Sequence, residues 1–256
     1  MSYECLTLEM KESVAVLTLN TPDQLNALTG GMQSELIEAA TEIAASDARA
    51  VVLGGAGRAF CAGVSIHEFA EIAASDDDAE RYEAFALGRK LADTLEAIPQ
   101  VTVAALHGFV VGGGVVLASV CDMRIAASDT TFSIPEIDLG ITLGWGGIKR
   151  FLREVSPPLA REFVMTGRRF TAHEALAAGF VNKVVPPEDV DAVALDLART
   201  IAAKPHAAIR TTKQHFAEIL DGDDTRDDAL TASQSLRDPE SAAAAAHYIA
   251  QLSGRS

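Results

Sequence analysis

Cysteine is scarce in this sequence. Its 256 residues include three, Cys5, Cys61 and Cys121, which are widely spaced and form no C-x-x-C pair. This spacing argues against a disulfide framework and against a structural zinc site, and it is typical of a protein from a reducing compartment. We therefore predict a cytoplasmic protein without a metal site.

Basic residues and long apolar runs are also few. The chain carries 21 Lys and Arg against 36 Asp and Glu, a net charge of −15. This balance disfavours nucleic acid and anionic membranes as partners. No apolar run approaches the roughly 18 residues that a transmembrane helix needs. The first residues show no basic region followed by an apolar core, so we expect no signal peptide.

What the sequence does contain is a run of three glycines between two apolar segments. Gly112, Gly113 and Gly114 follow a strand-like run at 101–106 and precede a helix-like run at 115–120. Without Cβ atoms, a ligand can approach the backbone N–H groups at a helix N-terminus, where the helix dipole favours negative charge. The run predicts a turn that binds an oxyanion or a phosphate. A turn that allows close packing of helix on strand is the alternative.

A second glycine turn follows the apolar run at 50–53. Its sequence is Gly54-Gly-Ala-Gly-Arg-Ala-Phe-Cys-Ala-Gly63. It is not a dinucleotide fingerprint, because Phe60 stands where the last glycine is required, and it is not a P-loop, because no G-K-[ST] occurs. A third element, Thr131-Phe-Ser-Ile-Pro-Glu136, places a carboxylate directly after a proline among apolar residues. Taken alone, Glu136 is best interpreted as a surface carboxylate in a salt bridge.

Hydrophobic periodicity predicts an α/β fold. Alternation at 4–9 and 13–19 indicates a hairpin, and helical spacing at 29–45 indicates a helix with Thr29 as its N-cap. Strands at 50–53, 101–106 and 122–127 alternate with helices at 81–97 and 113–119. The acidic segment between Ile66 and Arg81 is expected to be a solvated helix or a mobile segment. From Pro187 onward the chain is predicted to be helical, at 188–203, 205–220, 226–235 and 239–252.

Together, these motifs resemble the crotonase superfamily, also called the enoyl-CoA hydratase/isomerase family. The strings close to the family pattern are Gly57-Arg-Ala-Phe-Cys-Ala-Gly63, His107-Gly-Phe-Val-Val-Gly-Gly-Gly114, Ala118-Ser-Val-Cys-Asp122 and Pro135-Glu136. The likeness spans nearly the whole chain. It implies a crotonase-like spiral of ββα units over residues 1–187, which holds an acyl-CoA site. It also implies a C-terminal helical region over residues 188–256 that forms a homotrimer, or a hexamer of two trimers.

The resemblance also implies a chemistry. Family members bind acyl-CoA thioesters and stabilise an enolate on the thioester oxygen with two backbone N–H groups, here those of Val64 and Gly113. Coenzyme A is part of the substrate, so no separate cofactor is expected. The other implied substrate contacts are Arg58 near a CoA phosphate, Trp145 in the acyl pocket, and Ala62, Gly63 and Gly112.

The sequence departs from the family pattern at one catalytic position. Hydratases use two glutamates; the first position is Val116 here, and the second is Glu136. One carboxylate suffices to move a proton from C2 to C4 of a 3-enoyl thioester, and apolar surroundings should raise its pKa. We therefore expect an enoyl-CoA isomerase with Glu136 as its single base. The alternatives are a hydratase, another lyase or hydrolase acting on a specialised acyl-CoA, and a non-catalytic acyl-CoA-binding protein. Asp138 is a second candidate for a catalytic role.

Further polar residues receive other interpretations. Asp122 is expected to cap locally or to pair with Arg124 rather than to take part in chemistry. Ser65 and His67 stand where the family has Asp and Lys near the adenine of CoA, so those contacts are not carried over. Lys213 is a weaker candidate for a CoA contact.

Overall fold

Two β-sheets form the framework of the computed structural model, which describes residues 3–223 and 227–253. The larger sheet has the strand order β1 (Leu6–Lys11), β2 (Val14–Leu19), β3 (Ala50–Gly55), β4 (Val101–Leu106), β6 (Met123–Ala127) and β9 (Lys183–Val185). The smaller sheet has the order β5 (Phe109–Val111), β7 (Thr131–Ser133) and β8 (Phe170–Thr171). In the larger sheet β1 pairs antiparallel with β2, and the other pairs are parallel.

The chain passes from the larger sheet to the smaller one and then into a helix, and it repeats this path. β4 leads to β5 and then to α4 (Gly113–Ser119), and β6 leads to β7 and then to α5 (Gly147–Glu154) and α6 (Pro157–Thr166). This is the predicted spiral of ββα units. Because β5 and β7 are parallel neighbours, the segments that follow them begin side by side.

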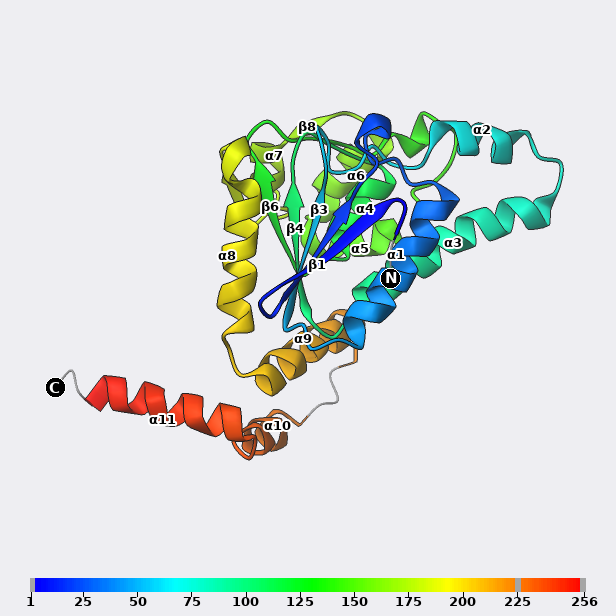
Figure 1. Ribbon diagram of the computed structural model, residues 1–256. Helices are drawn as coiled ribbons and strands as arrows, with labels where there is room; N and C mark the ends of the chain where they lie inside the picture. The colour runs from blue at the N-terminus through cyan, green and yellow to red at the C-terminus, as the bar shows by residue number, and fades with distance from the viewer. Residues whose placement is uncertain (1–2, 224–226, 254–256) are drawn as a thin grey trace.

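The other helices surround this framework. They are α1 (Gly30–Ala44), α2 (Ile66–Ala74), α3 (Asp78–Glu96), α7 (Ala172–Ala177), α8 (Val190–Ala202), α9 (His206–Leu220), α10 (Asp228–Ser235) and α11 (Pro239–Ser253), with short 3-10 helices η1 (Pro22–Gln24), η2 (Pro135–Ile137) and η3 (Pro187–Asp189). Figure 1 shows α8 beside the larger sheet, α2 and α3 extending from the body as an arm, and α10 and α11 apart from the sheets.

β4 is buried along its whole length because both faces of the larger sheet are covered. Val103 and Ala105 lie in one core with the stripe of α8 that contains Val190, Ala194 and Ala198, and α8 contacts β2, β3, β4 and β6. The next residues along β4, Ala104 and Leu106, belong to the second and larger core, which includes residues of α1 and α4. The alternation follows from the two-residue period of a strand. The mainly apolar sequence of β4 thus serves two cores.

The predicted elements are present with small shifts at their ends, which confirms the α/β class and the helical C-terminal region. Thr29 caps α1 by accepting a hydrogen bond from the Met32 N–H at 3.1 Å. The acidic segment after Ile66 forms α2 and the start of α3, and Asp77 accepts from the Ala79 N–H at 2.8 Å as the α3 cap. Residue 226, the first of the predicted helix 226–235, lies outside the described residues. The division at residue 187 and the trimer stay predictions.

The prediction that the chain has no transmembrane helix can be compared with the described helices alone. Across residues 3–223 and 227–253, none of the helices combines the length and the apolar character needed to cross a membrane.

One prediction about the polar residues is wrong. Asp122 does not pair with Arg124; its Oδ2 accepts from the Thr102 N–H at 2.7 Å and lies 2.7 Å from the Lys213 ammonium. Arg124 instead pairs with Glu154 at 2.6 Å. Lys213 therefore joins α9 to the sheet and lines neither of the two cavities described below. The predicted CoA contact of Lys213 stays a prediction. The partner of Asp122 depends on which helix packs beside the start of β4, and the local sequence does not specify that helix.

Candidate active site

Gly112 joins β5 to α4 with a backbone conformation that favours glycine, φ +50° and ψ −112°. Its N–H donates to the Ser133 carbonyl at 2.9 Å, because β5 and β7 end side by side. Glu136 follows β7 and thus lies beside Gly112. An ideal Cβ on Gly112 would be 2.5 Å from Oε1 of Glu136. Only glycine leaves room for the carboxylate at this point.

The second glycine turn, Cys61–Val64, lies directly against the first. The Val111 N–H donates to the Cys61 carbonyl at 3.0 Å. Gly63 has φ +89°, and an ideal Cβ there would be 2.9 Å from the Val111 oxygen and 3.8 Å from the Gly113 nitrogen. Two turns that are far apart in the sequence therefore meet, and glycine is needed where their backbones approach.

The N–H groups of Val64 and Gly113 have no acceptor within the described part of the chain. The Leu28 N–H donates to the Gly63 carbonyl at 2.7 Å, and the Ser65 N–H donates to the Leu28 carbonyl at 3.2 Å. Leu28 therefore bonds to the residues on either side of Val64, and the Val64 N–H points away from Leu28. Gly113 is the first residue of α4, where no intrahelical acceptor exists. Two unused donors thus lie in the paired turns.

Trp145 covers the Gly113 end of these turns. It is 8 % exposed and has φ +58°, which is uncommon for a bulky residue. Its ring lies so close to two glycines that an ideal Cβ would be 2.9 Å from it at Gly113 and 1.8 Å from it at Gly88 of α3. The buried guanidinium of Arg150 donates to the Trp145 carbonyl at 2.5 Å and is itself held by two carboxylates of α3. Ring packing and this network fix the tryptophan.

Glu136 projects from the short helix η2, which Pro135 begins. Its Oε2 is fully covered and has no hydrogen-bond partner among the described residues. Burial raises the pKa of Glu136 from 4.5 to about 6, and a hydrogen bond with its own backbone opposes this shift. A carboxylate with this pKa is ionised at neutral pH and binds a proton more tightly than an exposed glutamate, which suits a general base.

A cavity of about 690 Å³ extends from these turns to the arm formed by α2 and α3. Its turn side includes Ala62, Gly63, Val64, Gly112, Gly113, Glu136 and Trp145, and its helix side includes Phe69, Ile72, Ala84, Phe85 and Leu87. The lining is mainly apolar. Such a cavity can enclose an aliphatic chain, and Val64, Gly113 and Glu136 are among the residues at its turn side.

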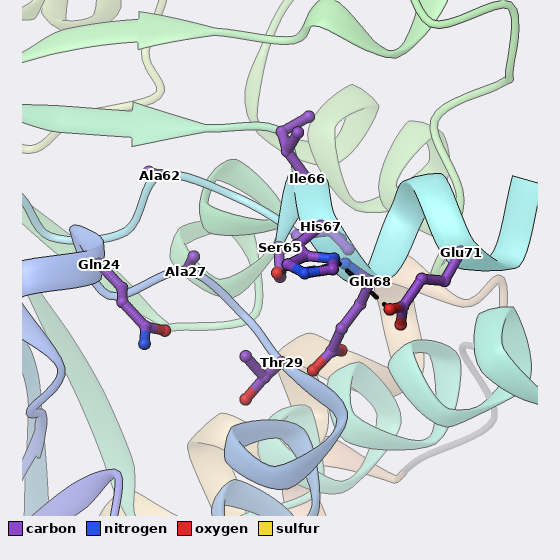
Figure 2. A pocket seen from close by; sticks show the side chains of 10 residues that line it. Gln24, Ala27, Thr29, Ala62, Ser65, Ile66, His67, Glu68 and Glu71 are labelled. Atoms are coloured by element: carbon purple, nitrogen blue, oxygen red, sulfur yellow. Dashed lines mark hydrogen bonds and ion pairs between the residues drawn. The ribbon is translucent and has the colours of Figure 1, made fainter.

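A second cavity, of about 600 Å³, adjoins the first and shares Ala62, Val64, Ile66, Glu68 and Glu71 with it. Figure 2 shows Thr29, His67 and Glu71 among the side chains around it. The Nδ1 atom of His67 lies 3.5 Å from a carboxylate oxygen of Glu71. The Ser65 hydroxyl accepts from the Glu68 N–H at 3.4 Å and caps α2. The side chains of Ser65 and His67 thus already have partners within α2.

Val116 occupies the α4 position that carries a glutamate in hydratases of the family. It is 1 % exposed, and it packs so close to α5 that an ideal Cβ on Gly147 would be 2.8 Å from it. Other carboxylates line the main cavity with Glu136: Asp138, Glu68, Glu71 and Glu80. Among the described residues, no three His, Cys, Asp or Glu side chains are arranged to hold a metal ion.

The structure does not bring Arg58 to the site. Its side chain is exposed and lines neither cavity, although its neighbour Ala59 is buried. The predicted contact with a CoA phosphate stays a prediction. The other predicted site residues all lie around the main cavity.

Sequence reasoning missed Gln33 of α1, which is 5 % exposed and lines the main cavity. The signal was present: Gln33 occupies a position on the apolar stripe of α1, in register with Leu36, Ala40 and Ile43. A polar side chain on a buried helical stripe needs a partner or a role.

Comparisons with known proteins identify the family and the fold of the chain. The family model "Enoyl-CoA hydratase/isomerase" matches residues 9–244. Crotonyl-CoA hydratase of Syntrophomonas wolfei is 37 % identical over 225 residues, 87 % of this chain and 85 % of that protein. Mitochondrial Delta(3,5)-Delta(2,4)-dienoyl-CoA isomerase of Pongo abelii is 34 % identical over 83 % of this chain and 68 % of that protein. The crystal structure of an enoyl-CoA hydratase from Mycobacterium smegmatis superposes with a TM-score of 0.87 at 28 % identity and covers 96 % of each chain. The chain belongs to the enoyl-CoA hydratase/isomerase family and has its crotonase fold.

Proposed function

We propose that this protein is an enoyl-CoA isomerase that moves a double bond through a thioester enolate, with Glu136 as its single base. The observation that carries the proposal is the covered, unpartnered Oε2 of Glu136, which lies beside the glycine turn of the candidate site. Val116 supports it as well, because an apolar side chain stands where a hydratase of the family has its other glutamate.

In the proposed reaction, the Glu136 carboxylate removes a proton from C2 of a 3-enoyl-CoA. The electron pair of the C–H bond forms a C1–C2 double bond, and the charge moves to the thioester oxygen. The Val64 and Gly113 N–H groups donate to that oxygen, and each such donor contributes about 3 kcal/mol or more to transition-state stabilisation. When the carbonyl re-forms, C4 takes the proton from Glu136 and the double bond lies between C2 and C3.

We infer that the CoA part of the substrate follows the cavity in Figure 2, which adjoins the main cavity at Ala62 and Val64. The acyl chain would then extend between Trp145 and the α2–α3 arm. The apolar lining of the main cavity supports this assignment, because it favours a hydrocarbon chain over a charged one.

Product analysis in heavy water tests the proposal. The purified protein is incubated with a medium-chain 3-enoyl-CoA, and the products are separated and weighed by mass spectrometry. We expect the conjugated 2-enoyl-CoA without added water. We expect Glu136→Gln to lower kcat by about 10³-fold, within the range for loss of a general base. Asp138→Asn is the matched control, because it removes another carboxylate of the same cavity; its kcat should stay near wild type.

Retention of activity by Glu136→Gln would contradict the proposal, and so would a product heavier by one water.

Hydration is the second candidate, and one observation favours it. Asp138 and Glu68 line the same cavity as Glu136, so a second carboxylate could hold the attacking water in place of the glutamate that Val116 replaces. In that case 2-enoyl-CoA would gain water, and Asp138→Asn or Glu68→Gln would abolish the gain. The same assay therefore separates the two reactions.

A further inference from the structure

Gln33 is a buried amide without a protein partner on the wall of the candidate cavity. Its side chain is 5 % exposed and lines the cavity together with Glu136. Its Oε1 is fully covered, and no described residue donates a hydrogen bond to it. Gln33 and Glu136 thus each carry an unpaired, covered oxygen, and both residues line one cavity, from helices on different parts of the framework.

Burying an unpaired amide costs folding free energy, and an apolar residue at position 33 would avoid that cost. The amide lies on a helical stripe whose other members, Met32, Leu36, Ala40 and Ile43, are apolar and buried. A leucine there would continue the stripe, and replacing an unpaired polar group by an apolar one of similar size is neutral or stabilising. A buried polar group that the fold does not pair calls for a partner from outside the chain.

We propose that Gln33 binds a hydroxyl group on the acyl chain of the substrate, so that the preferred substrate is a hydroxylated acyl-CoA. This inference rests on the proposed function of the same cavity. An amide oxygen needs a donor, and its NH₂ group can return a hydrogen bond to the same hydroxyl oxygen. A plain hydrocarbon chain supplies neither.

The charges around the cavity disfavour a second anionic group on the acyl chain. The ionisable side chains in its lining are all acidic: Glu68, Glu71, Glu80, Glu136 and Asp138. A second carboxylate on the acyl chain would be repelled by them and would meet no lysine or arginine in the described lining. A neutral hydroxyl meets the need of the amide without adding charge.

Binding measurements with unreactive ligands test this assignment. Trp145 is the single tryptophan of the sequence and lines the cavity, so its fluorescence reports binding. The ligands are octanoyl-CoA and a panel of monohydroxyoctanoyl-CoA isomers with the hydroxyl on successive carbons beyond C3. We expect one isomer to bind the wild type about tenfold or more tightly than octanoyl-CoA, and Gln33→Leu to abolish that preference.

Gln234→Leu is the matched control, because Gln234 is an exposed amide of α10 that lines neither cavity. It should leave the preference for the hydroxylated isomer unchanged. Thermal unfolding of Gln33→Leu should occur at the wild-type temperature or above, which shows that the variant is folded.

Two outcomes overturn the assignment. If octanoyl-CoA binds and no hydroxylated isomer binds more tightly, a water molecule satisfies Gln33 and the inference falls alone. If neither octanoyl-CoA nor any isomer binds, the inference falls together with the proposed function.

Discussion

The two sides of the main cavity are built in different ways. The turn side consists of Cys61–Val64, Val111–Gly114 and η2. Backbone hydrogen bonds hold its two glycine turns together, and Cys61, Gly63 and residues 112–114 are buried. The helix side consists of α2 and the first half of α3. No residue of α2 is buried, and the buried residues of α3 begin at Gly88. Figure 1 shows the corresponding arm extending from the body.

This difference separates two tasks. Donors that stabilise a developing charge must be fixed before the reaction, and in the proposed reaction the backbone of the turn side supplies them. A wall that receives an acyl chain must open to admit it, and segments with few buried contacts open at the lowest cost. Ile66 and Phe85 on the helix side are 66 % and 41 % exposed, so their apolar side chains are available to cover a bound chain.

The first test of this contrast is Gly113→Ala. The new Cβ would lie 2.9 Å from the Trp145 ring and 3.1 Å from Leu28, so the donor at Gly113 must shift. We expect kcat to fall by about 10²-fold or more, the usual effect of losing an oxyanion donor. Steady-state kinetics with 3-enoyl-CoA measures the change.

Gly144→Ala is the control for Gly113→Ala. Gly144 lies in the loop before Trp145 and has no atom within 4 Å of an ideal Cβ. Its activity should match the wild type. An active Gly113→Ala variant would show that the turn side is not the fixed half of the site.

The conformation of the turn side was largely predictable from sequence because it depends on short local segments. A few residues determine the conformation of each segment: the three glycines from Gly112 to Gly114, the Cys61–Val64 turn and the Pro135–Glu136 pair. The parallel pairing of β5 with β7 then brings Gly112 and Glu136 together. The raised pKa of Glu136 also agrees with the expectation from its apolar neighbours.

The rest depended on contacts between distant segments. The pairing of Asp122 with Lys213 requires α9 to pack beside β4, and no local pattern specifies that. The role of Gln33 as part of the wall depends on how α1 faces the cavity. Arg58 was placed by analogy, and its exposed side chain depends on a loop whose path only the fold defines.

The second test is the pH dependence of stability, which concerns Glu136 on the turn side. Because burial raises its pKa from 4.5 to about 6, the folded protein binds this proton more tightly than the unfolded chain. The ionised carboxylate therefore lowers the free energy of unfolding. The cost is absent below pH 4.5, grows between 4.5 and about 6, and is complete above that value.

We expect Glu136→Gln to be more stable than wild type by about 2 kcal/mol at neutral pH and to lose this advantage below pH 4.5. Urea unfolding at a series of pH values measures the difference. Asp138→Asn, which removes an exposed carboxylate, should change stability by no more than about 0.5 kcal/mol. Equal stability of wild type and Glu136→Gln at neutral pH would mean that the carboxylate is solvated rather than buried.

The smallest effect is expected on the helix side, from Asp77→Ala. The Asp77 carboxylate caps α3 through the N–H groups of Ala79 and Glu80, at 2.8 and 3.3 Å. Losing the cap costs about 1 kcal/mol, but the first half of α3 is not buried, so we expect local rather than global loss. Hydrogen exchange at residues 79–83 should accelerate about fivefold, and KM for acyl-CoA should rise a few-fold while kcat stays constant.

Asp76→Ala is the control, because the Asp76 carboxylate has no hydrogen bond in the described structure. A fall in kcat for Asp77→Ala would contradict the division, because it would show that the helix side positions the reacting groups as well as the acyl chain.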